Sequence, residues 1–287
     1  ISTDVGPALL INQNVTVQVY IHLEGTNTLK TTSVLSAALQ KDNLANLTID
    51  NAASNSTGNT GSLTAAAAAD SANGAGIGGG ANGNGTNGNG SKITISGGSV
   101  IAYSNSYGSG IGGGNKGNGS NIAISGGSVT AYSKQHGSGI GGGYNGNGSD
   151  IAISGGSVTA YSLRNGSGIG GGYKGNGSNI TISGGSVEAH SEWYGSGIGG
   201  GRDGSGSDIT ISGGSVTAYS ARNGSGIGSG IGGGYNGNSN NIYISGGSVK
   251  AQTLDYTPVK SANENISVYR CDILNQNISD IFIDQNK

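Results

Sequence analysis

Short runs of alternating apolar and polar residues follow one another along this chain. Within residues 121–144, Ile122-Ala123-Ile124 alternates, and Val129-Thr130-Ala131-Tyr132-Ser133 alternates again after a Gly-Gly pair. A third, glycine-rich run contains a single apolar residue, Ile140. Alternation with a period of two in such short pieces is typical of β-strands, and the Gly and Asn residues between them favour tight turns. The pattern predicts three short strands and no helix in this stretch.

The same pattern recurs at a fixed period. The motif Ile-Ser-Gly-Gly-Ser has its first Ser at positions 96, 125, 154, 183, 212 and 245, so four spacings of 29 residues precede one of 33. A second motif, Gly-Ile-Gly-Gly-Gly, has its Ile at positions 77, 111, 140, 169, 198 and 231. Three strands per repeat of this length predict an all-β fold, a single-stranded parallel β-helix (a solenoid) of roughly nine or ten coils.

The repeat divides one predicted β-helix into three parts. Residues 75–251 hold the regular repeats, and residues 1–74 follow the same alternation less strictly, as in the run from Val15 to Leu23. Residues 252–287 contain two further apolar runs, at Ile266–Tyr269 and Ile281–Ile283. Because the terminal repeats of a solenoid cap its core, we expect irregular coils at the start and divergent coils or a cap at the end.

The composition of the chain excludes several other classes of protein. The chain has 61 Gly among 287 residues but only 2 Pro, which excludes collagen, and its lone Cys271 excludes a disulfide scaffold. The hydrophobic share of 33% fits a narrow core. A net charge of −2 gives no sign of a nucleic-acid partner, and no apolar run is long enough to predict membrane insertion. The start at Ile1, without Met or an apolar leader, indicates a processed or excised segment.

The order of the motifs resembles a known type of protein. Leu23-Glu24-Gly25-Thr26-Asn27-Thr28-Leu29, then Leu47-Thr48-Ile49, then Gly76-Ile77-Gly78-Gly79-Gly80, is similar to β-helix repeats of large bacterial surface proteins, chiefly of Gram-positive gut and rumen organisms. The repeats Ile-x-Ile-Ser-Gly-Gly-Ser-Val-Thr-Ala-Tyr extend the likeness to Val249. Such proteins are often described as adhesins or as containing carbohydrate-binding domains. The resemblance implies a right-handed β-helix, an extracellular position at the cell surface, and an attachment or structural duty without catalysis.

Equivalent positions of successive coils form columns, and one outward column is aromatic. It contains Tyr103, Tyr132, Tyr161, His190, Tyr219 and Gln252. A neighbouring outward column contains mostly Thr but also Glu188. Aromatic faces with a hydroxyl are suited to holding sugars, which predicts a glycan-binding Tyr/Thr face. The alternative is purely structural, because Tyr and Thr are also good strand formers that pair across strands.

Two further features carry aromatic side chains. A second column, after the glycine-rich strand, includes Tyr144 and Tyr173, and a variable loop includes Arg164, Trp193 and Arg222 in one column. A cation–π contact is expected in that loop column. The coil from Glu188 to Tyr194 departs most from the consensus, so it is the best candidate for a specific site.

The sequence predicts no catalytic residue, metal site or cofactor. The column Lys92, Asn121, Asp150, Asn179, Asp208 and Asn241 separates its two carboxylates by a coil, so we expect an amide ladder there and not a Ca²⁺ site. The three His residues lie in different columns, and the acidic residues are scattered. Asn-x-Ser/Thr sequons, including those at Asn118, Asn147 and Asn176, fall mostly in Asn-Gly-Ser turns, and turn chemistry alone accounts for them.

These observations lead to one expected function and three alternatives. We expect an extracellular structural or adhesive segment whose tyrosine face binds a cell-surface or plant polysaccharide. The first alternative is a spacer or fibre subunit that associates end to end through its open coil edges. The second is a polysaccharide lyase or hydrolase, which would use Glu188 or Glu192. The third is ice binding by a flat Thr face, against which the interruptions at Glu188 and Lys250 argue.

Overall fold

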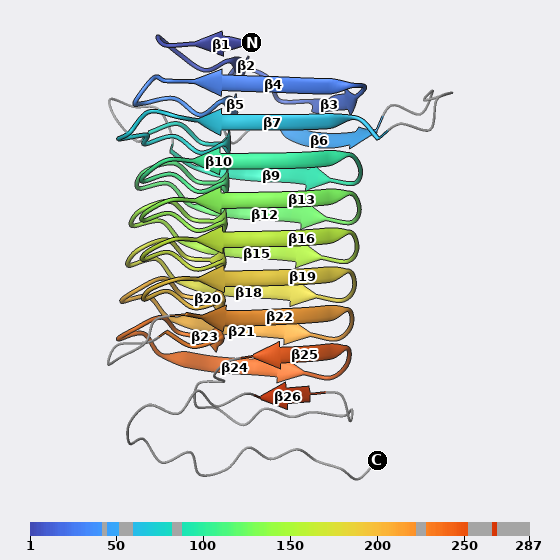
Figure 1. Ribbon diagram of the computed structural model, residues 1–287, viewed down its shortest axis with the longest axis vertical. Coiled ribbons are helices and arrows are strands. Elements are labelled where there is room, and N and C mark those ends of the chain that lie inside the picture. Colours follow the sequence, from blue (N-terminus) through green and yellow to red (C-terminus); the bar gives the residue numbers. More distant parts are fainter. Residues whose placement is uncertain (42–44, 52–59, 82–87, 222–227, 252–265, 269–287) are drawn as a thin grey trace.

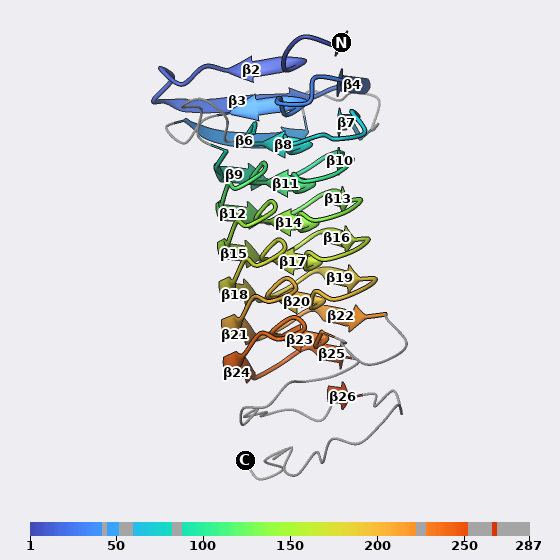
Figure 2. The same ribbon diagram turned by 90° about the vertical axis from the view of Figure 1, so that its left-hand side faces the viewer.

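The chain forms a right-handed parallel β-helix with three strands in each coil. The computed structural model describes residues 1–41, 45–51, 60–81, 88–221, 228–251 and 266–268. The coils stack along one axis from the first strands to the last (Figure 1), and the view turned by 90° separates the three sheets that run the length of the stack (Figure 2). The predicted fold class and the three strands per coil are confirmed.

Each sheet collects one strand from every coil. The tyrosine sheet contains, in spatial order, β1 (Ser2–Thr3), β4 (Thr26–Thr31), β7 (Ser62–Ala67), β10 (Ser99–Ser104), β13 (Ser128–Ser133), β16 (Ser157–Ser162), β19 (Ser186–Ser191), β22 (Ser215–Ser220), β25 (Ser248–Ala251) and β26 (Ile266–Val268). The glycine sheet contains β2 (Leu9–Ile11), β5 (Leu39–Lys41), β8 (Ile77–Gly78), β11 (Ile111–Gly112), β14 (Ile140–Gly141), β17 (Ile169–Gly170), β20 (Ile198–Gly199) and β23 (Ile231–Gly232). The isoleucine sheet contains β3 (Gln18–Leu23), β6 (Asn46–Asn51), β9 (Gly90–Ile95), β12 (Gly119–Ile124), β15 (Gly148–Ile153), β18 (Gly177–Ile182), β21 (Gly206–Ile211) and β24 (Ser239–Ile244).

The strand count sets the length of the described solenoid at about eight coils. Two sheets have eight strands each, and the tyrosine sheet has ten because β1 and β26 extend it at its ends. The described part is therefore slightly shorter than the nine or ten coils expected. The strand expected at Ile266 is present as β26, whereas Gln252, Cys271 and the run Ile281–Ile283 lie outside the described residues.

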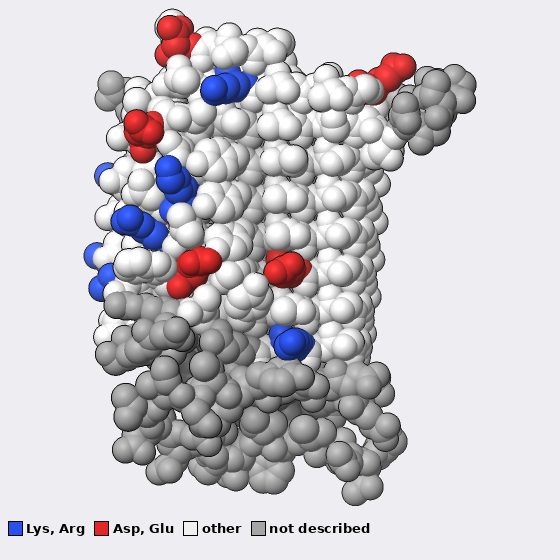
Figure 3. All heavy atoms as spheres, viewed as in Figure 1, with Lys and Arg blue, Asp and Glu red and all other residues white. Residues whose placement is uncertain are grey.

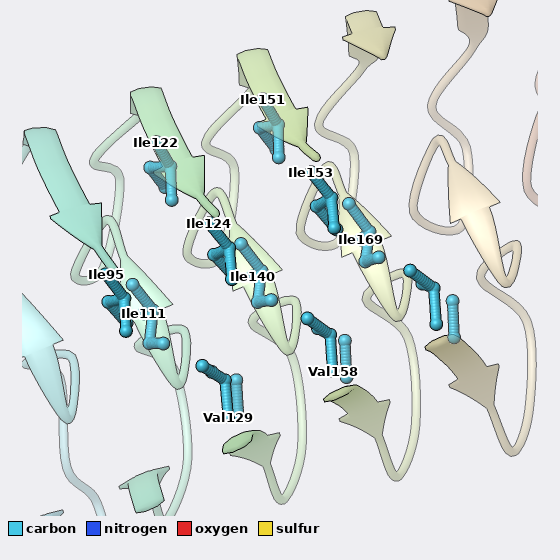
Figure 4. Packing of buried hydrophobic residues seen from close by; sticks show 14 of the residues in the cluster. Ile95, Ile111, Ile122, Ile124, Val129, Ile140, Ile151, Ile153, Val158 and Ile169 are labelled. Atoms are coloured by element: carbon cyan, nitrogen blue, oxygen red, sulfur yellow. The ribbon is translucent and has the colours of Figure 1, made fainter. Parts of the chain in front are cut away.

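The core is a narrow column of stacked side chains, as the low hydrophobic share predicts. In one coil Ile122, Ile124, Val129, Ala131 and Ile140 point inward and are at most 1% exposed. Each stacks on the equivalent residue of the next coil, because the strands pair in register (Figure 4). Burying one large aliphatic side chain contributes about 1.5–3 kcal/mol. Such columns exist only when coils stack, so each coil depends on its neighbours.

Glycine in the glycine sheet is required by the close approach of successive coils. Gly141 has a φ of +128°, and a Cβ built on it would lie 2.1 Å from the carbonyl oxygen of Gly170 in the next coil. No side chain fits in that space. Next to this strand, the buried hydroxyl of Ser138 donates to the carbonyl of Gly142 at 2.9 Å, and buried Ser133 donates to Gly108 at 2.9 Å. Both serines recur in neighbouring coils, so the buried corners have their polar groups paired.

Candidate functional site

The tyrosine column lies on the outward face of the tyrosine sheet, half-buried between its neighbours. Tyr103, Tyr132 and Tyr161 pair in register in β10, β13 and β16. Their ring centroids are 5.2 and 5.3 Å apart, and successive ring planes differ by 9°. The faces of these rings therefore stack on one another. The column presents ring edges and hydroxyls to solvent, and not the open ring faces that we expected from the sequence.

His190 interrupts the column in β19 and is only 8% exposed, although it occupies an outward position. Its ring meets Tyr161 edge to face at 4.5 Å and lies 3.9 Å from the ring of Tyr219. The Nε2 atom is buried and has no hydrogen-bond partner. Burial lowers the pKa of His190, while the nearby carboxylates of Glu192 and Glu188 oppose this shift.

Two glutamates of the same coil flank His190, and each accepts a hydrogen bond from a tyrosine of a neighbouring coil. Tyr161 donates its hydroxyl to Oε1 of Glu192, and Tyr219 donates to Oε1 of Glu188 at 3.2 Å. Burial and these carboxylates raise the pKa of both tyrosines, so the phenols stay protonated near neutral pH. The sequence placed Tyr161, His190, Tyr219 and Glu188 on one outward face and Glu192 in the variable loop; it did not show these two hydrogen bonds.

The tyrosine column ends at Tyr103, whose partner in β7 is Ala66. Tyr103 therefore has a tyrosine on one side and a methyl group on the other. Its hydroxyl donates to Oδ1 of Asn105 at 2.7 Å, and the amide of Asn105 reaches Asp70 at 3.3 Å. Asp70 was not among the residues singled out from the sequence. It belongs to the irregular first part of the chain, where no repeat predicts its position.

The second aromatic column lies against the variable loops. The backbone N–H of Tyr144 donates to the carbonyl of Tyr107 at 2.8 Å, and that of Tyr173 donates to His136 at 2.8 Å. Tyr144 and Tyr173 have centroids 5.3 Å apart with planes tilted by 32°. The Tyr107 ring meets that of Tyr144 edge to face at 5.4 Å. Loop and turn thus form one aromatic surface, whereas the sequence predicted the column and the variable loop as separate features.

Cations are part of this second surface. The guanidinium of Arg202 lies 4.5 Å from the ring of Tyr194, 5.8 Å from that of Tyr173 and 6.0 Å from that of Tyr235. Arg164 lies 5.7 Å from the exposed ring of Trp193, so the cation–π contact expected there is confirmed, while Arg222 lies outside the described residues.

The column that contains the two aspartates is an amide ladder, as predicted. The amide of Asn179 donates to Asp150 at 2.6 Å, and that of Asn241 donates to Asp208 at 3.0 Å. A second ladder, not predicted, joins the sequon residues: the backbone N–H of Asn147 donates to Oδ1 of Asn118 at 2.8 Å. Within the described ranges, no group of three or more His, Cys, Asp or Glu residues is arranged to hold a metal ion.

Comparison with known proteins agrees with this architecture. The family described as Beta helix repeat matches residues 93–115, 122–144, 151–173, 180–202 and 209–235. No curated protein and no solved structure gives a significant match. The matched segments begin at equivalent residues of five successive coils, so the chain contains a β-helix repeat region. Across the residues that the structure describes, we find no helix long and apolar enough to cross a membrane.

Proposed function

We propose that this β-helix is a structural and adhesive segment of an extracellular surface protein and that it binds glycans along the tyrosine column. The observation that carries the proposal is the in-register series Tyr103, Tyr132 and Tyr161, with one ring every 5.2–5.3 Å. This spacing is close to the advance per sugar in an extended β-1,4-linked polysaccharide. Successive hydroxyls would then meet successive sugars of a chain lying parallel to the solenoid axis.

The stacked rings define how a glycan would be held. Because the inner ring faces are covered by neighbouring rings, the ring edges supply apolar contact and the phenol oxygens accept hydrogen bonds from sugar hydroxyls. Tyr103 and Tyr161 donate their own protons to Asn105 and Glu192. The face of Tyr103 toward Ala66 has no ring beside it in the same column, so it is where one sugar can stack on an aromatic plane. The carboxylates of Glu188 and Asp70 near the two ends of the column add acceptors for sugar hydroxyls.

The proposal assigns binding without catalysis to the coil of His190. Glu188 and Glu192 are each held by a tyrosine hydroxyl, and the free nitrogen of His190 is buried. General acid–base catalysis needs a group within hydrogen-bond reach of the reacting bond, and a buried Nε2 does not offer one in this arrangement. Product release from a polysaccharide would contradict this assignment. Protease accessibility on intact source cells tests the extracellular position.

Affinity gel electrophoresis tests the glycan proposal. The probes are a soluble β-1,4-linked glucomannan and, for comparison, an α-1,6-linked dextran. We expect glucomannan to retard the protein and the triple variant Y103F/Y132F/Y161F to bind roughly tenfold more weakly, because each lost hydrogen bond costs about 0.5–1.5 kcal/mol. Tyr243→Phe is the matched control, since Tyr243 is 46% exposed on the isoleucine sheet, away from the column.

Two results would overturn the proposal. One is the absence of retardation by glucomannan and by a wider panel of neutral glycans. The other is retardation that stays unchanged in the triple variant. Either result, together with concentration-dependent filaments in electron micrographs, would favour the alternative of a spacer that associates end to end.

A further inference from the structure

We propose that a second surface, separate from the tyrosine column, binds a carboxylated polysaccharide, one that contains uronic acids, directly through cationic side chains. We call this surface the basic ridge. It consists of the loops that follow β10, β13, β16 and β19 and the turns that follow β11, β14, β17, β20 and β23. These loops and turns lie side by side, because turn residues such as Tyr173 and Arg202 donate backbone hydrogen bonds to the loops at His136 and Asn165.

The ridge concentrates positive charge on a chain whose net charge is −2. Its described cations are Lys116, Lys134, Arg164, Lys174 and Arg202. The acidic residues in the same loops and turns are Glu192 and Asp203. Figure 3 shows Lys and Arg gathered along the left-hand edge, where these loops lie, while most of the neighbouring sheet face is uncharged. A local excess of cations attracts a polyanion even when the whole molecule is weakly acidic.

Arg202 is the best-placed anion-binding group of the ridge. Its guanidinium is held among the rings of Tyr194, Tyr173 and Tyr235, and Asp203 approaches Nε at 3.6 Å without a hydrogen bond. Within the described residues its side chain makes no hydrogen bond, so its terminal nitrogens keep their donors for a ligand. A guanidinium presents a planar fork that matches a carboxylate. Rings that fix this fork in advance reduce the entropy lost on binding.

The aromatic rings of the ridge favour a sugar polymer over other polyanions. Unlike the stacked tyrosine column, these rings are tilted or edge to face, as at Tyr107–Tyr144 and Tyr144–Tyr173, so parts of their faces are not covered by one another. Trp193 is 43% exposed beside Arg164. Sugar rings pack on such apolar planes while their carboxylates meet the cations.

The acidic residues set among the cations also argue against nucleic acid. A phosphodiester backbone carries denser charge and is bound by closely set cations. Glu192 and Asp203, set among the cations, would repel such a backbone more than a polymer with one carboxylate per sugar.

Isothermal titration calorimetry against polygalacturonate tests this proposal, with fully methyl-esterified polygalacturonate, inorganic polyphosphate and duplex DNA as further probes. All titrations contain EDTA, so binding through an added divalent cation is removed. We expect polygalacturonate to bind, its ester to bind at least tenfold more weakly, and affinity to fall as salt rises. The triple variant R164Q/K174Q/R202Q should lose roughly tenfold in affinity for polygalacturonate, because three charge-assisted contacts are lost. Lys92→Gln is the control, since Lys92 is an exposed cation on the isoleucine sheet.

The outcomes separate this inference from the proposed function. Glucomannan binding that depends on the tyrosine column, together with no polygalacturonate binding, would overturn the ridge proposal alone. Polygalacturonate binding that survives the triple variant, or equal affinity for the methyl ester, would also overturn it. Tighter binding of duplex DNA or polyphosphate than of polygalacturonate would show that the ridge recognises phosphate instead.

Discussion

The ring of His190 lies 3.9 Å from the ring of Tyr219, closer than the 5.2–5.3 Å between the stacked tyrosines of the same column. The imidazole is smaller than a phenol ring, and it is buried between Tyr161 and Tyr219 with Glu188 and Glu192 beside it. A protonated imidazole would bring a charge into this buried position. Burial therefore lowers the pKa of His190 and favours its neutral form.

This burial predicts that stability falls as the solution becomes acidic. Burial lowers the pKa of His190 from its ordinary value of 6.5 in the folded state, whereas the unfolded chain keeps the ordinary value. The unfolded state then binds more protons below about pH 6.5, so the free energy of unfolding decreases as pH falls through that region. Urea denaturation at pH 7.5, 6.0 and 5.0 measures the slope.

The variant His190→Tyr restores the residue found at most positions of the column and should remove part of this slope. His136, whose pKa is also lowered, first by burial and then by Arg164, accounts for a further part, and His136→Gln tests it separately. An unchanged slope in the double variant H136Q/H190Y would show that neither imidazole is responsible for the acid sensitivity.

The packing of the core column predicts that shortening one isoleucine side chain strongly lowers the free energy of unfolding. Ile151 is fully buried in the middle of the solenoid, so Ile151→Ala should lower the free energy of unfolding by about 2–5 kcal/mol. The adjacent Ala152 points outward, where the equivalent position of the next coil is Thr181. Ala152→Thr is therefore the control, with an expected change within about 0.5 kcal/mol. Similar effects of the two substitutions in chemical denaturation would contradict the assigned inward and outward faces.

How far the sequence predicts this structure depends on what a repeat can encode. Alternation assigns Ile122 and Ile124 to the inside and Tyr132 to the outside, and the fixed period aligns each residue with its equivalent in the next coil. Those predictions are confirmed, because parallel strands that pair in register place each residue against its equivalent in the next coil. The repeat does not encode the rotation of a ring about its side-chain bonds, so the stacking of Tyr103 on Tyr132 was not predicted.

Two parts of the candidate sites were missed for different physical reasons. His190 occupies an outward position, and its ring is buried between the rings of Tyr161 and Tyr219. The contact of Tyr107 with Tyr144 joins two columns from successive coils, so it depends on how the loop and the turn fold in space. The burial of His190 does not repeat along its column. The loop-to-turn contact does repeat, as at His136–Tyr173, but it joins residues of different columns, which a pattern compared within one column does not reveal.

Successive coils approach closely in the glycine sheet. Adding one methyl group to a glycine there should therefore strongly destabilise the fold. In Gly141→Ala the new Cβ would meet the carbonyl of Gly170 at 2.1 Å and would also need a φ of +128°. Backbone strain of about 1–3 kcal/mol and overpacking of about 1–3 kcal/mol then add to roughly 2–6 kcal/mol. Thermal denaturation followed by circular dichroism measures the loss. Gly6→Ala is the control, because nothing lies within 4 Å of a Cβ at that position and its φ is not positive; equal melting temperatures of the two variants would contradict the packing argument.

The hydrogen bonds between the sequon asparagines predict that a substitution at Asn147 changes the protection of one backbone amide, that of Asn176. Oδ1 of Asn147 accepts the backbone N–H of Asn176 at 2.8 Å, on the exposed side of the turn. Asn147→Ala removes that acceptor and should cost about 0.5–1.5 kcal/mol, whereas Asn147→Asp keeps an oxygen at the same place and should preserve the bond. Hydrogen exchange at the Asn176 amide measures this directly, with faster exchange expected in the alanine variant and near-native protection in the aspartate variant. If protection is equal in all three proteins, the ladder does not hold the turn, and the coil-to-coil backbone bonds of the neighbouring strands alone determine its stability.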